Sequence, residues 1–417
     1  MRHRDFAAHH PSTGLPVVGM VGAGQLARMT HQAAIGLGQS LRILAADPGD
    51  GAALVAADVL IGHHTDLAAL RKLAAGAEVI TFDHEHVPPE HLRALVAEGV
   101  KVYPGPDALL HAQDKQVMRE RLSALGVPVP RWAPVSSVED VVRFSAAGMD
   151  AAVVAKATRG GYDGRGVWML TDPSQAQELL EAGTSLIVEE RVPLVRELAA
   201  VVARSPFGQV AAWPVVETVQ RDGICVEVLA PAPGLSEERA LAAQELAIRL
   251  AAELDVVGVL AVELFETADG VVVNELAMRP HNSGHWTIEG SRTSQFEQHL
   301  RAVLDYPLGA TGLTAPVVVM ANLLGGDVTP PMPGAFMSDH SVEAGEGHVY
   351  KAPAEMSLDE RLHHMFAAEP GVKVHLYGKK VKPGRKIGHV TALGDDLEQT
   401  RARAQRAVTW LREGRPS

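Results

Sequence analysis

Residues 15–110 alternate apolar runs with helical segments, and no other feature constrains the fold of this chain as strongly. The first apolar run leads directly into Gly22-Ala23-Gly24, and a helix is predicted from Gln25 to about Gly38. Later strands are predicted at 40–48, 58–62 and 77–82, with a helical segment at 67–76. Because strands that alternate with helices form parallel sheets with right-handed crossovers, we predict a doubly wound α/β domain.

The pattern changes after residue 111. One helix is predicted over 112–126, and Pro128 and Pro130 make the next segment extended. Short strands, one long helix at 236–255 and a tight strand pair at 257–276 then indicate an α+β layout with an antiparallel sheet. The predicted domains are a disordered extension at 1–14, a first domain at 15–111, a second at 112–320 and a third at 321–417.

Charge and cysteine content narrow the class of protein. The 417 residues include 38 Lys+Arg and 50 Asp+Glu, a net charge of −12, which argues against a nucleic acid or an anionic membrane as partner. No apolar run is long enough to cross a membrane. The single cysteine, Cys225, excludes an internal disulfide and predicts a reduced, cytoplasmic compartment. Its strand pattern predicts a core residue rather than a nucleophile.

A Gly22-x-Gly24-x-x-Ala27 motif joins the first strand to the first helix. Such glycines bring backbone N–H groups close to an anion at a helix N-terminus, and Asp47 follows the next strand where a ribose-binding acid would lie. This interpretation favours an NAD-dependent oxidoreductase. The alternative is a tight turn found in any doubly wound fold, and the motif alone does not separate the two.

A second glycine-rich segment runs from Lys156 to Gly166, between two apolar strands. Its glycines and its cations suit a triphosphate, since exposed N–H groups and a lysine at a strand end bind phosphate oxygens. The order of residues is not that of a Walker loop. An ordinary long hairpin is the alternative, but a hairpin does not need so many cations, so we favour phosphate binding.

Two carboxylates, Glu263 and Glu275, lie on the predicted strand pair with Asn274 beside one of them. Together with the glycine loop they predict a Mg²⁺ site that bridges nucleotide phosphates, whereas alone they would be interpreted as salt-bridged glutamates. The turn from Arg279 to Trp286 gathers a cation, amide and hydroxyl groups and two imidazoles. We expect it to bind an anion and transfer protons.

Two further clusters leave alternatives open. Lys379, Lys380, Lys382, Arg385 and Lys386 form a local basic cluster that either clamps a single phosphate or is a solvated turn. His84 and His86, on either side of Glu85, have the spacing of a metal site, although a surface coincidence is the more common outcome.

Four motifs together resemble a known family. They lie at residues 22–29 (GAGQLARM), 160–166 (GGYDGRG), 282–287 (NSGHWT) and 382–389 (KPGRKIGH). The chain resembles the ATP-grasp superfamily and, within it, the 5-(carboxyamino)imidazole ribonucleotide synthases over about residues 15–392. The resemblance implies a Rossmann-like pre-ATP-grasp domain, an ATP-grasp domain with a mobile lid at about 130–206, and a small C-terminal domain. It also implies carboxylation of aminoimidazole ribonucleotide by bicarbonate, driven by ATP through carboxyphosphate.

The same resemblance implies site residues. Some relatives carry an arginine at the position of His111 and a histidine at that of Gln220. Mg²⁺, or Mn²⁺ in its place, would be held by Glu263 and Glu275. The ATP-binding residues would be His111, Lys115, Lys156, Gly161, Tyr162, Asp163, Gly164, Arg165, Gly166, Glu189, Glu190, Arg191, Val192, Glu197, Gln220, Asn274 and Glu275.

Arg279 would stabilise the transferred phosphoryl group, with His285 and Asn282 at the bicarbonate end. The substrate-binding residues would be Gly24, Gln25, Leu26, Glu85, Ser283, Lys379, Arg385 and Lys386. A homodimer is the family expectation, and the partners are small molecules. The alternatives are another ATP-grasp ligase, such as a formate-dependent glycinamide ribonucleotide transformylase, the oxidoreductase above, and a non-catalytic nucleotide-binding module.

Overall fold

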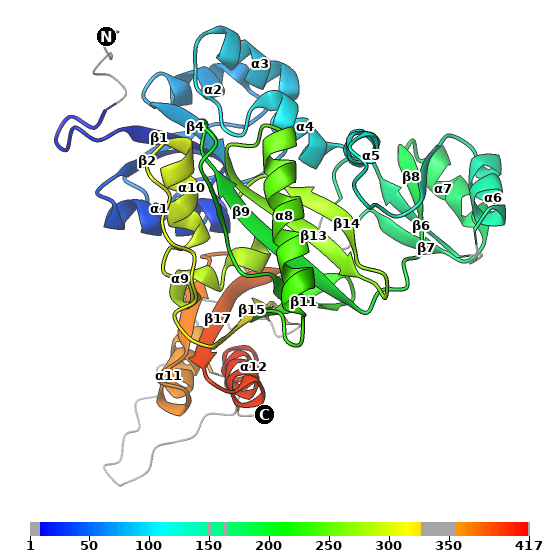
Figure 1. Cartoon of the computed structure of the whole chain (residues 1–417). Coiled ribbons are helices and arrows are strands. Elements are labelled where there is room, and N and C mark those ends of the chain that lie inside the picture. The colour runs from blue at the N-terminus through cyan, green and yellow to red at the C-terminus, as the bar shows by residue number, and fades with distance from the viewer. Residues whose placement is uncertain (1–8, 149–151, 162–164, 327–355, 416–417) are drawn as a thin grey trace, which may run out of the picture. The chain divides into compact units, whose positions relative to one another are not determined.

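A computed structural model describes residues 9–148, 152–161, 165–326 and 356–415, and the chain divides into two compact units, Met1–Thr314 and Ala315–Ser417 (Figure 1). Among these residues no helix combines the length and the apolar character needed to cross a membrane. Within the extension predicted at 1–14, His9 bridges Pro16 and the His10 carbonyl accepts the N–H of Gly14. The rest of that extension lies outside the described residues.

The first unit begins with a parallel sheet in the order β3-β2-β1-β4, which confirms the predicted doubly wound domain. Alternate strand side chains enter two cores: Val18 and Met20 pack toward one helix layer, and Val21 packs toward the other. The elements are β1 (Val17–Val21), α1 (Gln25–Gly36), β2 (Ser40–Ala45), β3 (Asp58–Ile61), α2 (Leu67–Ala74), β4 (Val79–Phe82) and α3 (Pro89–Ala97).

The helix predicted over 112–126 corresponds to α5 (Lys115–Ala124), and the helix that precedes it, α4 (Pro106–Gln113), was not predicted. The break falls at Asp114, whose carboxylate accepts the N–H groups of Gln116 and Val117. Because such a cap satisfies the free donors of a new helix, the chain restarts there rather than continuing α4.

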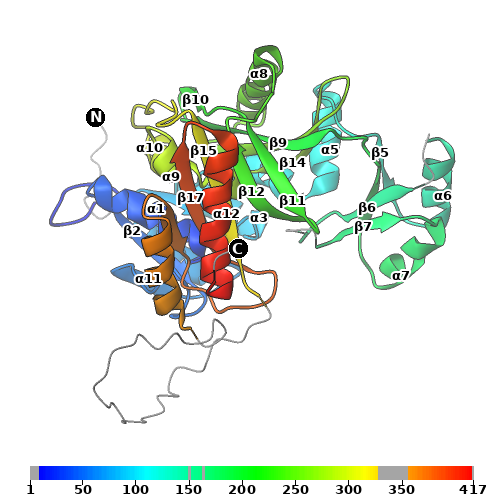
Figure 2. The same cartoon turned by 90° about the horizontal axis from the view of Figure 1, so that it is seen from below.

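A four-stranded antiparallel sheet follows, in the order β5-β8-β6-β7, and we refer to it as the lid sheet. The helices α6 and α7 lie beside this sheet (Figure 2). Val141 and Phe144 of α6 are buried with the strand residues Val153 and Val188. The elements are β5 (Trp132–Val135), α6 (Val138–Ala146), β6 (Val153–Ala157), β7 (Val167–Leu170), a 3₁₀ turn at Pro173–Gln175, α7 (Ala176–Glu181) and β8 (Leu186–Glu190).

The larger antiparallel sheet of the first unit has the order β14-β13-β9-β11-β12, with β10 paired to β9. Strand β9 was predicted inside the lid boundary at about 206, but it pairs along its whole length with β13 and is central to this sheet. The elements are β9 (Arg196–Arg204), β10 (Val210–Ala212), β11 (Val216–Arg221), β12 (Ile224–Ala230), α8 (Glu237–Glu253), β13 (Gly258–Glu266), β14 (Val271–Ala277), a 3₁₀ turn at Asn282–Gly284, α9 (Thr287–Gly290) and α10 (Gln295–Val303).

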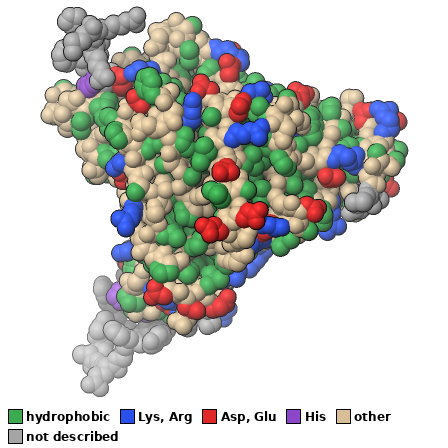
Figure 3. Space-filling model, viewed as in Figure 1, with side chains coloured by type: hydrophobic (Ala, Val, Ile, Leu, Met, Phe, Trp, Pro, Cys, Tyr) green, Lys and Arg blue, Asp and Glu red, His purple; other side chains and the backbone are tan. Residues whose placement is uncertain are grey.

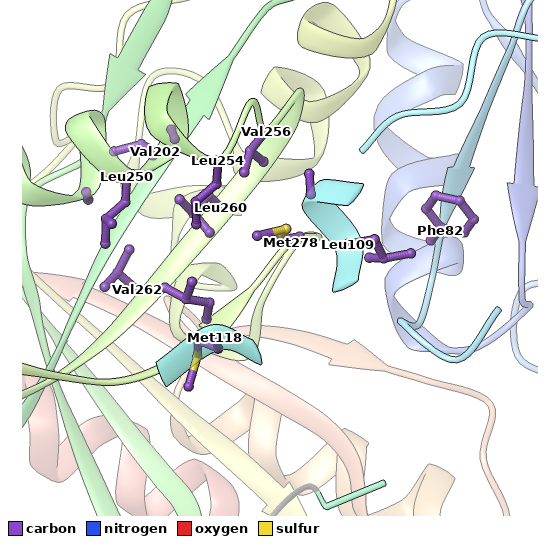
Figure 4. Packing of buried hydrophobic residues seen from close by; sticks show 14 of the residues in the cluster. Phe82, Leu109, Met118, Val202, Leu250, Leu254, Val256, Leu260, Val262 and Met278 are labelled. Atoms are coloured by element: carbon purple, nitrogen blue, oxygen red, sulfur yellow. The ribbon is translucent and has the colours of Figure 1, made fainter. Parts of the chain in front are cut away.

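One hydrophobic core joins the parallel sheet to the larger antiparallel sheet. Phe82 of β4, Leu109 of α4 and Met278 beyond β14 lie in this core with residues of α8 and β13 (Figure 4). Leu109 is fully buried, and a buried leucine contributes about 1.5–3 kcal/mol relative to exposure. The parallel-sheet domain, with α4, and the larger antiparallel sheet therefore share an interior.

The second unit contains a three-stranded antiparallel sheet in the order β15-β17-β16. Leu411 of α12 and Met365 of α11 are buried in this unit, as are Val318 and Val390 of the sheet. The elements are β15 (Val317–Leu324), α11 (Leu358–Ala368), β16 (Lys373–Leu376), β17 (Lys386–Gly394) and α12 (Leu397–Glu413).

Candidate active site

Glu263 and Glu275 stand directly opposite each other on β13 and β14, as the sequence predicted for a strand pair. Opposed residues of an antiparallel pair share a face, and two like charges in that arrangement repel. An ammonium and an imidazole lie against the two carboxylates: Glu275 accepts a hydrogen bond from the Lys115 ammonium, and Glu263 Oε1 lies 3.1 Å from His281 Nε2. The pair is therefore a site that favours a cation.

Lys156 on β6 connects the lid sheet to strand β14. Its ammonium donates to Asn274 Oδ1 at 2.9 Å, beside Glu275, and lies 2.8 Å from Glu189 Oε2. The Lys156 side chain is only 8% exposed, so these contacts replace water. The lysine that the sequence placed at the base of the glycine loop thus meets the carboxylate strand.

Glu189 is buried on β8, with its side chain 3% exposed. Its Oε1 accepts from Arg119 Nε at 2.7 Å, and its Oε2 faces Lys156. Burial alone would raise the pKa of Glu189, but the charges of Lys156 and Arg119 outweigh burial and lower it. The side chain is thus an internal counter-ion for two cations.

Glu197 lies on β9, two positions along from the residue opposite Glu263, and therefore on the same face. Burial raises the pKa of Glu197 to about 7, and the neighbouring Glu263 carboxylate adds to the rise. A hydrogen bond from Gln220 on β11 opposes this shift. Glu197 and Gln220 are thus in contact.

The other predicted nucleotide residues lie at the edges of this cluster. A side chain at Gly161 would come within 2.7 Å of the Arg165 carbonyl oxygen, and Gly166 has a φ of +71°. Glu190 accepts from the Arg131 N–H at 2.9 Å, while Arg191 is exposed and Val192 half-buried. His111 Nδ1 contacts the Ala108 carbonyl at 3.2 Å within α4. Tyr162, Asp163 and Gly164 lie outside the described residues.

The donor set at Glu263, Glu275 and Asn274 fits Mg²⁺. This ion binds through one or two carboxylates and completes its octahedron with waters and substrate phosphates. The described residues hold no group of three or more His, Cys, Asp or Glu side chains arranged for a metal. Two carboxylates beside the Lys156 ammonium therefore suit an ion that would arrive with a phosphate ligand, not one held by protein alone.

Glu85 and Arg279, predicted at the substrate end, form an ion pair with Nε and Oε2 3.1 Å apart. Glu85 Oε1 also accepts the N–H of Met278 at 2.8 Å, so the carboxylate spans two consecutive residues after β14. The Arg279 cation is thereby held against the loop that follows β4.

His285 is fully buried in the turn after β14. Gln295 fixes its tautomer, because the Gln295 amide accepts from the His281 N–H at 2.9 Å and donates to the His281 carbonyl at 2.7 Å. The amide nitrogen then lies 3.0 Å from His285 Nδ1, which must accept. In its neutral form His285 therefore carries its proton on Nε2. The predicted neighbours Asn282 and Ser283 are buried beside it, and Ser283 Oγ lies 2.9 Å from His281 Nδ1.

The first glycine turn holds an internal anion. Asp83, after β4, accepts the N–H of Gly24 at 2.5 Å and that of Ala27 at 2.9 Å, so its carboxylate covers the N-terminus of α1. A side chain at Gly24 would lie 2.5 Å from Asp83 Oδ2. Gln25 begins α1 and Leu26 is buried. Asp47 accepts the N–H of Gly49 in a local turn at 2.7 Å. The α1 N-terminus, where a dinucleotide phosphate would bind, is occupied by Asp83.

The histidines around Glu85 form a row. The ring of His84 lies 4.6 Å from that of His64 and 5.4 Å from that of His86, measured between centroids. Burial lowers the pKa of His84 to about 3, with a smaller contribution from the neighbouring histidines and from Arg279. The His84 and His86 rings are stacked, and the His64 ring meets His84 edge-on. The spacing of His84 and His86 does not make a metal centre among the described residues.

The second unit holds the C-terminal basic cluster. Lys386, at the start of β17, is buried, whereas Lys380, Lys382 and Arg385 are exposed. Lys379 Nζ lies 5.7 Å from the centre of the Tyr377 ring. On the face drawn in Figure 3, acidic and basic side chains are interspersed rather than gathered into one basic tract.

Several residues at this site were not predicted from the sequence. They are Asp83, Arg119 and Gln295. Arg119 had a usable signal, because it lies four residues after Lys115 and so faces the same way on a helix. Asp83 had none, since it acts on Gly24 and Ala27, 59 and 56 residues away, and Gln295 was not marked by any motif.

Three family models match the chain in succession. They are a ribonucleotide synthetase preATP-grasp domain at residues 15–113, an ATP-grasp domain at 120–296 and a phosphoribosylaminoimidazole carboxylase C-terminal domain at 318–403. The predicted architecture is confirmed by these matches.

Similar proteins cover nearly all of the chain. The N5-carboxyaminoimidazole ribonucleotide synthase of Mycobacterium tuberculosis H37Rv is 60% identical over 96% of this chain and 89% of its own length. That of Corynebacterium ammoniagenes is 49% identical over 97% and 93%. Among solved structures, the Aspergillus clavatus N5-carboxyaminoimidazole synthase in complex with ADP and 5-aminoimidazole ribonucleotide is 30% identical, with a TM-score of 0.80 over 95% of this chain and 98% of that one. The synthetase of Thermus thermophilus gives 36% identity and a TM-score of 0.78 over 96% and 99%.

Proposed function

The chain belongs to the N5-carboxyaminoimidazole ribonucleotide synthase family, and we propose that its described side chains divide the reaction between a nucleotide end and a carboxylation end. The family is one of ATP-dependent carbon–nitrogen ligases in purine biosynthesis. The observation that carries the division is the meeting of Lys156, Asn274 and the opposed pair Glu263 and Glu275 on one face of the large sheet.

At the nucleotide end, Lys156 binds ATP phosphate oxygens as the point charge at the base of the glycine loop. Glu263, Glu275 and Asn274 hold Mg²⁺, which supplies charge neutralisation to the phosphates when bound. Lys115 holds the Glu275 carboxylate in place until then. Glu197 and Gln220 contact each other at this end, and we propose that they bind the nucleotide ribose.

The reaction proceeds in two steps, phosphoryl transfer and then carboxylation. A bicarbonate oxygen bonds to the γ-phosphorus as the bond to ADP breaks, which gives carboxyphosphate. The exocyclic amine of the ribonucleotide then bonds to the carboxyl carbon, phosphate leaves, and the amine loses a proton. The net reaction is ATP, bicarbonate and 5-aminoimidazole ribonucleotide to ADP, phosphate and the carboxyamino product.

At the carboxylation end, Arg279 is always charged and stabilises the anions of both steps. The Glu85 carboxylate orients it through the 3.1 Å ion pair. His285 holds a proton on Nε2 because Gln295 occupies Nδ1, so it is arranged to donate a hydrogen bond to an oxyanion. In the second unit, Lys379, Arg385 and Lys386 bind the 5′-phosphate of the ribonucleotide.

The proposal is tested by ADP release. With Mg²⁺ and bicarbonate present, ATP hydrolysis is expected to rise sharply when aminoimidazole ribonucleotide is added, and no rise in folded protein would contradict it. Replacing both substrates by formate and glycinamide ribonucleotide is the control for another ATP-grasp ligase. We also propose a cytoplasmic homodimer, and light scattering that gives the monomer mass would overturn the dimer.

A further inference from the structure

Arg119 of α5 is fully buried, which is rare for an arginine. Its guanidinium makes three hydrogen bonds: Nε to Glu189 Oε1 at 2.7 Å, and its two terminal nitrogens to the carbonyls of Val273 at 3.1 Å and Asn274 at 2.7 Å. Every bond reaches either the lid sheet or β14. The residue therefore holds the strand that carries Asn274 and Glu275 against the strand that carries Glu189.

The buried cluster of Arg119, Lys156 and Glu189 holds two cations and one anion. The Glu189 carboxylate lies between two cations, Arg119 on one oxygen and Lys156 on the other. All three side chains are less than a tenth exposed, so water does little to screen them. With Arg119 present, the group carries one positive charge in excess. Without it, Glu189 and Lys156 would form a neutral, buried pair 2.8 Å apart.

A lysine held by a carboxylate of full charge is a poor phosphate ligand, because the two anions compete for one ammonium. Arg119 weakens that competition by occupying one of the two carboxylate oxygens. It also donates to the carbonyl of Asn274, the residue whose side chain accepts the second bond of Lys156. Both partners that orient Lys156 are thus set by one guanidinium.

We propose that Arg119 is a positioning residue for ATP: by neutralising Glu189 and anchoring Asn274, it leaves the Lys156 ammonium available to nucleotide phosphates. Arg119 does not itself touch substrate. The inference rests on the proposed function in one respect, since it takes Lys156 to be a phosphate ligand. It goes beyond that function by assigning a residue outside the glycine loop and the carboxylate pair.

The test is a charge-balance series measured as the dissociation constant for ATP with Mg²⁺ by calorimetry, and as the KM for aminoimidazole ribonucleotide. Arg119→Met should weaken ATP binding about tenfold, the loss of one charge-assisted contact, while the ribonucleotide KM changes less than about twofold. Arg119→Lys keeps the positive charge but loses the forked set of N–H donors. Its dissociation constant for ATP should therefore lie between those of the unchanged protein and Arg119→Met.

The double variant Arg119→Met with Glu189→Gln decides the mechanism. The amide introduced by Glu189→Gln would still accept a bond from Lys156 but would not compete with phosphate, so ATP affinity should return to within about threefold of the Glu189→Gln single variant. This comparison also serves if Arg119→Met alone fails to fold, because removing both charges of a buried pair is tolerated far better than removing one. Affinity that stays about tenfold below the single variant would overturn the proposal.

Two further variants separate the outcomes. Arg121→Met is the matched control, because Arg121 lies on the same helix but donates to the Glu253 carbonyl and is 41% exposed; its ATP affinity should match the unchanged protein. Lys156→Met tests the premise. Unchanged ATP binding in that variant would refute Lys156 as phosphate ligand, whereas weak binding there with normal binding in Arg119→Met would refute the role of Arg119 alone.

Discussion

The two glycine turns of the chain look alike in sequence but differ in structure. Both place glycines after an apolar strand, and both were candidates for phosphate. At the first turn the carboxylate of Asp83 accepts the backbone N–H groups of Gly24 and Ala27. At the second turn Gly161 and Gly166 lie close to the backbone of the turn itself, with Lys156 at the base and Asn274 and Glu275 of β14 beyond it. Glycine spacing therefore reports close backbone approach, and the neighbouring charges decide what is approached.

The largest expected effect is the loss of turnover when the carboxylate next to the second turn is removed. Glu275→Gln should lower kcat by about a hundredfold or more, because it removes one ligand of an ion that neutralises the transferring phosphoryl group. Steady-state ADP release measures the loss, and circular dichroism should show an unchanged fold. Glu253→Gln is the control, since Glu253 pairs at the surface with Arg121 and should leave turnover unchanged. Normal turnover in Glu275→Gln would refute the metal assignment.

Asp83 follows strand β4, so the first turn depends on how firmly β4 is held. The pH dependence of the free energy of unfolding tests one contact of β4. The fully buried His299 lies 2.7 Å from Thr81 on β4 and accepts the Val259 N–H at 3.1 Å. Burial lowers its pKa to about 4 from 6.5. Between these values the unfolded chain binds the proton and the folded one does not, so stability falls as pH drops from 6.5 through 4, by about 3 kcal/mol in all.

Urea unfolding at pH 7 and at pH 4 should therefore show a larger loss for the unchanged protein than for His299→Gln, which does not titrate. The comparison uses the change with pH in each protein, so the variant's own lower stability at pH 7 does not enter. Equal losses in the two proteins would mean that another group governs the acid limb.

A smaller effect tests whether Asp83 truly closes the first turn. Asp83→Ala should lower the free energy of unfolding by about 2 kcal/mol, because it removes two charge-assisted bonds at the α1 N-terminus. Asp66→Ala is matched to it, since Asp66 caps α2 through one exposed bond and should cost about half as much. If Asp83→Ala costs no more than Asp66→Ala, the carboxylate is not part of the turn's structure.

The smallest expected effect concerns the binding site of the ribonucleotide phosphate, since Asp83 already occupies the N–H groups at the first turn. Lys379→Ala should raise the KM for aminoimidazole ribonucleotide about tenfold and leave ATP affinity unchanged, because one charge-assisted phosphate contact is lost. Lys373→Ala, an exposed lysine on β16, is the control. A rise in the dissociation constant for ATP instead would move the basic cluster to the nucleotide.

Local pattern predicted much of this structure. The strands of the parallel sheet with helices α1 and α2, the opposed glutamates of β13 and β14, and Lys156 at a strand end all follow from periodicity and spacing, whereas α3 was not predicted. The break between α4 and α5 was missed because Asp114 lies inside a helical pattern, and only its bonds to the next turn reveal a cap.

The contacts that complete the site were beyond prediction for a different reason. Asp83 meets Gly24 from 59 residues away, and Arg119 meets Asn274 from 155 residues away. Helix spacing could mark Arg119 itself, but nothing local identifies the distant partner in either pair, because the two residues meet only after the chain has folded. The resemblance to a family supplied residue types at the site but not the internal pairs that orient them.

The shared core has a consequence for synthesis of the chain. Leu109 lies in one cluster with Met278, so the interior around α4 is incomplete until the later residue has been made. The interval spans 278 − 109 = 169 residues, which at roughly 5–20 residues per second takes on the order of ten to thirty seconds. During that time the nascent first domain exposes apolar surface, so chaperone demand should be set by the ribosome's progress through the second domain.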